Sequence, residues 1–77
     1  MHQFRLTKHA VERMTERKIS YDAISQVLTH GVTTITEFGR KITRVGWLSL
    51  DLDPTLREFA DIRVVWNDKN ILTVFRT

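Results

Sequence analysis

Three side chains near the start of the chain, His9, Arg13 and Arg17, have types and a spacing that could act on a phosphodiester. Residues four apart on a helix lie one turn above another, so a helix over residues 7–17 stacks the three in a column. We call them the basic column. Two arginines at this spacing repel by roughly a few tenths of a kcal/mol unless an anion lies between them. The sequence offers two such anions, a carboxylate of the same helix or a bound phosphate.

Acid–base chemistry on a phosphate ester could be built from these side chains. A neutral histidine near arginines could act as a general base, or as an acid once it is protonated, and the arginines could neutralise a bound phosphate. His9 is the candidate for proton transfer, with Arg13 and Arg17 neutralising the phosphate. The alternative is a surface histidine beside two solvated arginines paired with Glu12 and Glu16.

Further cations and one hydroxyl lie in the strand-like second half of the chain. A cation inside an apolar strand marks either an exposed face or a phosphate-binding face. The candidates for substrate binding are Arg63, Arg76, Arg44 and Lys41, with Arg40 nearby. The hydroxyl of Thr73 could bond a phosphate oxygen, or Thr73 could be a simple β-former. The aromatic residues Tyr21, Trp47, Trp66 and Phe75 could stack on unpaired bases or fill the core.

Composition narrows the classes of protein that this chain can be. Its 77 residues make one domain, and a hydrophobic content of 42% excludes a disordered chain. The net charge of +3 favours a polyanionic partner. No cysteine is present, and no apolar run approaches the ~20 residues of a membrane span, so we expect a cytoplasmic protein. The sequence contains neither a metal-ligand spacing nor a P-loop, so we expect no metal and no cofactor.

The first half of the chain predicts two helices. Thr7 is a plausible N-cap for a helix that ends near Lys18, where cations favour the negative end of the helix dipole. Ser20 is a second N-cap, and an apolar stripe follows it up to Gly31, which we expect in the usual left-handed position after a helix. The apolar face of each helix requires a covering element.

The second half predicts the sheet that covers them. Strand-like runs occupy residues 32–38, 41–52, 61–66 and 71–76, with a tight hairpin over 67–70. Residues 1–6 could be a short edge strand or an extended lead-in, and residues 55–60 could be a helical turn or a strand. The order predicts an α+β fold with two N-terminal helices packed on a roughly four-stranded antiparallel sheet. On the last strand, alternation places Leu72 and Val74 on one side and Ile71, Thr73 and Phe75 on the other. Both sides are apolar, so we expect this strand to be central and covered on both faces.

The two ends of the chain resemble a known family. "LTKHAVERMTERKISYDAISQVLTHG" and "IRVVWNDKNILTVFRT" are similar to short uncharacterised bacterial and phage proteins, grouped with RelE/ParE-like toxins in the barnase–EndoU–colicin–RelE superfamily. The resemblance covers most of residues 1–77, with residues 32–57 the least distinctive. It implies a single RelE-like domain and a toxin-like endoribonuclease that needs no metal and cleaves RNA by 2′-hydroxyl attack. His9, Arg13, Arg17 and Thr73 are the catalytic positions that it carries over.

The resemblance also implies partners. The first is RNA, which such a protein could reach in association with the ribosome. The second is an acidic antitoxin or immunity protein that neutralises the toxin. We expect no interaction with a membrane. The alternative function is a non-catalytic module of the same fold that binds nucleic acid or docks another protein. The appearance of cleavage products would separate these two functions.

Overall fold

The computed structural model describes residues 4–46, 51 and 53–77. Over these residues helices pack against a five-stranded sheet, so the predicted α+β class is confirmed. The helices are α1 (Lys8–Arg17) and α2 (Tyr21–His30), and the 3₁₀ turns are η1 (Glu37–Gly39) and η2 (Pro54–Phe59). The strands are β1 (Arg5–Leu6), β2 (Gly31–Ile35), β3 (Lys41–Val45), β4 (Ile62–Asn67) and β5 (Asn70–Arg76).

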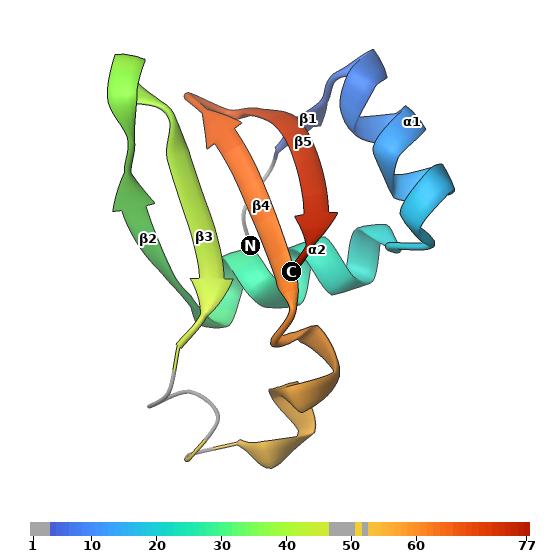
Figure 1. Cartoon of the computed structure of the whole chain (residues 1–77), viewed down its shortest axis with the longest axis vertical. Helices are drawn as coiled ribbons and strands as arrows, with labels where there is room; N and C mark the ends of the chain where they lie inside the picture. Colours follow the sequence, from blue (N-terminus) through green and yellow to red (C-terminus); the bar gives the residue numbers. More distant parts are fainter. Residues whose placement is uncertain (1–3, 47–50, 52) are drawn as a thin grey trace.

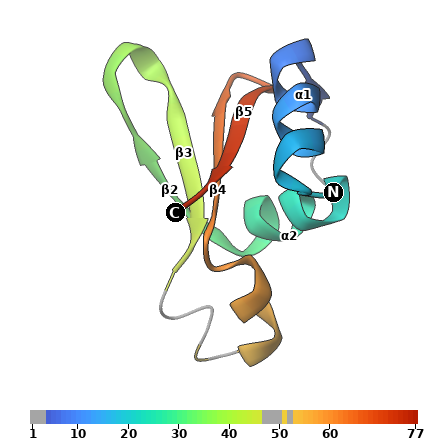
Figure 2. The ribbon, with the colours of Figure 1, turned by 45° about the vertical axis from the view of Figure 1, so that its right-hand side comes forward.

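The sheet has the order β1-β5-β4-β3-β2 and is mixed. Strand β1 pairs in parallel with β5, whereas the other neighbours are antiparallel. The prediction of an antiparallel sheet of about four strands is therefore wrong in one strand. That strand is β1, which confirms the edge-strand alternative within residues 1–6, although the parallel direction of its pairing was not predicted. Both helices lie on one side of the sheet, with α1 alongside β5 (Figures 1 and 2).

Local capping defines both helices as the sequence predicts. The Thr7 hydroxyl accepts a hydrogen bond from the Ala10 amide at 3.2 Å, and the Ser20 hydroxyl accepts one from the Ala23 amide at 3.0 Å. Helix α1 ends at Lys18, which has a left-handed φ of 54°. These bonds satisfy amides that a helix start otherwise leaves unpaired.

Gly31 ends α2 in a different way from the prediction. Its φ is −87°, so it is extended rather than left-handed, and the chain passes directly from α2 into β2. A Cβ at this position would lie 2.3 Å from the Val27 carbonyl oxygen and 2.6 Å from the Thr43 methyl carbon. The glycine is needed because backbone and β3 approach too closely for a side chain.

The core lies between the helices and one face of the sheet. Ala10, Ile24 and Val27 from the helices pack there against Val64 and Val74 from the sheet. The polar residue Thr43 is also buried, at 1% exposure, and its hydroxyl bonds both Trp66 and Thr33 at 2.8 Å. The predicted strand over 41–52 ends at Val45, and its residues 47–50 and 52 lie outside the described part of the chain. Residues 55–60 mostly form the 3₁₀ turn η2.

A register shift in β5 changes which residues share a face. Trp66 pairs with Ile71 and Val65 pairs with Thr73, which leaves Leu72 as the extra residue of a bulge. Ile71 and Val74 therefore both face the helices although they are three residues apart, and both are fully buried. We expected Leu72 and Val74 to share one face and both faces to be covered. Both expectations are wrong, because the bulge shifts the alternation and the helices lie on one side only.

Candidate nucleic-acid interface

The sheet face turned away from the helices is open and carries basic, hydroxyl and apolar side chains. On the helix side, Val45, Ile62 and Val64 are buried. On the other side none of the six central residues is buried, and we call these six the open face. The open face consists of Ile42, Arg44, Arg63, Val65, Thr73 and Phe75.

Strand register places these residues in order across the sheet. Ile42 pairs with Val65, and Val65 pairs with Thr73, so the three lie in one row across β3, β4 and β5. Arg63 pairs with Phe75 in a neighbouring row. Directly paired antiparallel residues have Cβ atoms about 4.5–5.5 Å apart, so the three-residue row spans about 10 Å and the Arg63–Phe75 pair about 5 Å. An extended polymer strand fits such a surface.

Beside the first row lies a groove of about 460 Å³. Its floor is Ile42, Val65 and Thr73, and its wall comes from the turn that joins β2 to β3, including Phe38 and Arg40. Thr36 and Glu37 complete the lining. The groove thus combines apolar walls with a cation and hydroxyl groups.

The two arginines of the open face differ in their partners. Arg44 is exposed. Arg63 is half-buried, and its Nη1 donates to the Ala60 carbonyl at 2.9 Å, which holds the guanidinium near the start of β4. An arginine has five N–H groups, so this contact leaves donors for an anion.

The basic column meets the sheet at one end. Arg17 Nη1 donates to the Val74 carbonyl at 2.7 Å, on the β5 edge that β1 leaves unpaired. Thr7 bonds the Ile71 carbonyl of the same edge at 2.8 Å. Helix α1 thus lies along β5 and uses side chains to satisfy its free carbonyl groups.

The other two members of the basic column point elsewhere. His9 is exposed in the first turn of α1. Arg13 Nη1 pairs with Glu16 Oε2 at 2.6 Å, which is the carboxylate alternative that the sequence left open. Arg17 binds the residue next to Thr73, but the Thr73 side chain lies on the opposite side of the strand from Val74. The structure therefore brings together Arg44, Arg63 and Thr73 on one face, with Arg17 at its edge.

Two of the predicted substrate-binding cations lie away from the open face. Lys41 pairs with Trp66 in the register and its Nζ stands 4.9 Å from the centroid of that ring, on the helix side of the sheet. A cation over an aromatic face is attracted by the ring quadrupole. Trp66 also packs edge-on against Phe4, and both rings are partly buried against the core.

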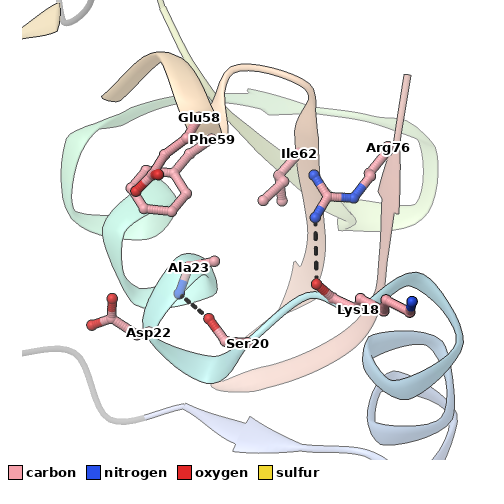
Figure 3. Close-up of a pocket in the computed structure, with 8 residues that line it drawn as sticks. All are labelled: Lys18, Ser20, Asp22, Ala23, Glu58, Phe59, Ile62 and Arg76. Carbon is pink, nitrogen blue, oxygen red and sulfur yellow. Dashed lines mark hydrogen bonds between the residues drawn. The ribbon is translucent and has the colours of Figure 1, made fainter. Parts of the chain in front are cut away.

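Arg76 joins the end of β5 to the end of α1. It forms an ion pair with Asp61 at 3.2 Å and donates to the Arg17 and Lys18 carbonyls at 3.4 Å. Figure 3 shows Arg76 beside a hollow of about 290 Å³ between α2 and η2, opposite Glu58. Because acids and bases both line this hollow, it has no clear preference for an anion.

Sequence reasoning named Arg40 but missed Phe38, which lies in the same turn between β2 and β3. Phe38 is 91% exposed and has a φ of 62°, and Gly39 follows it with a φ of 74°. A large apolar residue directly before the glycine of a turn was the available signal. The role of Phe75 was open because its face depends on the bulge.

The described residues show neither a metal-binding group nor a helix that could span a membrane. In the part of the chain that the structure describes, no group of three or more His, Asp or Glu residues could hold a metal ion. Among the same residues, no helix has the length and apolarity that crossing a membrane requires.

Comparison with known proteins places the chain in a family. A family model described as a domain of unknown function, DUF4258, matches residues 6–76. The chain belongs to the DUF4258 family. No curated protein and no solved structure matches it. The matched residues include both helices and strands β2 to β5, so the open face and the basic column lie within the DUF4258 domain.

Proposed function

We propose that this DUF4258 protein is a metal-independent, toxin-like endoribonuclease of the RelE/ParE type that binds RNA across the open face. The observation that carries the proposal is the gathering of Arg44, Arg63 and Thr73 on one uncovered sheet face, with Arg17 at its edge. Phosphate contacts from arginine and threonine supply most of the affinity in nucleic-acid complexes. The resemblance of both chain ends to RelE/ParE-like proteins supports the same function.

The proposed reaction is an internal transfer at phosphorus. A base removes the 2′-hydroxyl proton, the O2′–P bond forms, the P–O5′ bond breaks, and the 5′-oxygen takes a proton. The products are a 2′,3′-cyclic phosphate and a 5′-hydroxyl. His9 transfers protons in this scheme, which needs no metal and no redox partner.

The arginines stabilise the charge that develops on the phosphate. Arg17 donates one N–H group to the Val74 carbonyl, and its other N–H groups can donate to a phosphate at the β5 edge. Arg13 exchanges Glu16 for the phosphate, and the loss of the ion pair costs little because an exposed i,i+3 pair contributes only about 0.2–1 kcal/mol. Thr73 positions the RNA strand from the adjacent groove.

We place this activity in the cytoplasm, where RNA and ribosomes are present. A toxin of this kind needs a neutralising partner, and an acidic antitoxin or immunity protein would complement the net charge of +3. Such a partner would compete with RNA for the open face.

Cleavage of mixed RNA by pure protein in excess chelator tests this function. We expect wild-type protein to release fragments that end in a 2′,3′-cyclic phosphate, and we expect His9→Ala to lower the rate by about 10²–10⁴-fold. Arg57→Ala is the matched control, because it removes an exposed cation from η2, which packs on α2. Equal cleavage by wild type and His9→Ala would refute the role of His9.

A second candidate function is binding of RNA without cleavage. The Arg13–Glu16 pair at 2.6 Å favours it, since it neutralises the middle of the basic column without a phosphate. The same incubation separates the candidates. Retarded but intact RNA on a native gel would indicate a binding module, whereas new fragments would indicate an enzyme.

A further inference from the structure

The turn between β2 and β3 exposes the aromatic ring of Phe38 to solvent, and the backbone of this residue has an unfavourable left-handed conformation. Phe38 has a φ of 62° and a ψ of 25°, a left-handed conformation that glycine and asparagine adopt more readily. Its side chain is 91% exposed, so packing does not compensate for the conformation. The hairpin turn needs a positive φ at its two central residues, Phe38 and Gly39, but asparagine or glycine meets that need at a lower cost, so the fold does not explain why the first of them is a phenylalanine.

The ring forms part of the wall of the groove that runs onto the open face. Ile42 and Val65 form its apolar floor, Thr73 lies beside them, and Arg40 stands on the same turn as Phe38. A ligand that fits has a flat apolar body and an attached anion. An unpaired nucleotide has both, since its base offers a π-face and its phosphate offers the charge.

We propose that Phe38 and this groove bind one unpaired nucleotide of a single-stranded RNA, with the base stacked on the Phe38 ring and the adjoining phosphate on Arg40. This inference rests on the proposed function and adds the class of substrate, single-stranded rather than duplex RNA. A nucleotide held there continues along the row from Ile42 to Thr73 toward the β5 edge.

The structure favours RNA over a protein partner at this groove. An apolar protein segment would be matched by apolar walls throughout, whereas this lining includes Thr36, Arg40 and Thr73. Arg44 extends the basic character two residues further along β3 on the same face. Glu37, also in the lining, can accept a hydrogen bond from the exocyclic amine of a base.

The test measures binding of a fluorescent 2′-O-methyl RNA strand, which lacks the free hydroxyl and cannot be cleaved. Anisotropy titrations compare wild type with Phe38→Asn and Phe38→Trp. Asparagine tolerates the left-handed backbone, so Phe38→Asn removes the ring without loss of folding. We expect Phe38→Asn to raise the Kd roughly tenfold or more and Phe38→Trp to keep the affinity.

Two controls separate stacking from charge and from general apolarity. Ile35→Ala removes another exposed apolar side chain, 71% exposed and outside the groove lining, and should leave the Kd unchanged. The same strand annealed to its complement should bind wild type and Phe38→Asn equally, because paired bases are not available for stacking.

Each outcome distinguishes this inference from the proposed function. Equal affinity of wild type and Phe38→Asn for the single strand would overturn the nucleotide site and leave the open face in place, and the ring would then serve a protein partner. Failure of wild type to bind any strand would overturn both proposals. Binding that depends on Phe38 without cleavage of ordinary RNA would support this inference and refute only the nuclease.

Discussion

At the scale of single residues, some cations of this protein bond to other groups of the fold, and others are exposed and could bind a ligand. Arg76 bonds two carbonyl groups at the end of α1 and pairs with Asp61, and Lys41 lies over Trp66. Arg44 is exposed on the open face. The residue types and the four-residue spacing of the basic column could be identified from the sequence. The carbonyl groups that Arg17 and Arg76 bond could not, because they lie almost sixty positions away in the chain.

The buried Thr43 hydroxyl yields a prediction at this scale. It accepts the Trp66 Nε1 hydrogen bond and shares another with Thr33, so Thr43→Val leaves a half-buried indole donor without its acceptor. We expect the free energy of unfolding to fall by about 1–3 kcal/mol in urea denaturation. Thr34→Val, at an exposed position of the neighbouring strand, is the control and should be nearly neutral. A loss no larger than that of the control would contradict this account.

At the scale of elements, features that depend on residues close together in the sequence could be predicted. Features that depend on strands far apart in the sequence could not. Thr7 and Ser20 were identifiable as caps because a capping bond joins residues three apart. The two-residue turn between β4 and β5 was identifiable for the same reason, with Asp68 at a φ of 53°. The parallel pairing of β1 and the bulge at Leu72 depend on strands that meet only in the folded chain.

The capping residue of η2 yields a prediction about pH. Asp53 accepts hydrogen bonds from the Thr55 hydroxyl at 2.5 Å and the Thr55 amide at 3.1 Å, and these hold the pKa of its carboxyl below the ordinary value of 3.8. A lowered pKa in the folded state stabilises the fold above the unfolded value, and this stabilisation is lost as the pH falls through the folded value.

Thermal unfolding of wild type and Asp53→Asn across acidic pH checks this effect. At neutral pH we expect Asp53→Asn to melt at a slightly lower temperature, because the site is exposed. As the pH falls below 3.8 the wild-type advantage should shrink and disappear. A difference in Tm that stays constant with pH would show that the carboxylate charge is not the cause.

At the scale of the whole molecule, the two sides of the sheet have different roles. The helices lie on one side of the sheet (Figure 2), where the core forms. The other side carries basic, hydroxyl and apolar side chains, and none of its six central residues is buried. The sequence predicted the fold class, because the order of helices and strands carries that information. It did not predict which side of β5 stays open, since a one-residue bulge decides the face of Thr73 and Phe75.

The most direct test of the open face is an NMR titration of ¹⁵N-labelled protein with the uncleavable 2′-O-methyl RNA strand. We predict that amide shifts concentrate on β3, β4 and β5 around Arg44, Arg63 and Thr73, and on the turn that carries Phe38. Amides of α2 and η2 should remain in place, because they lie on the covered side. Shifts confined to α2 and η2, or no shifts at saturating RNA, would contradict the proposal that this sheet face binds RNA.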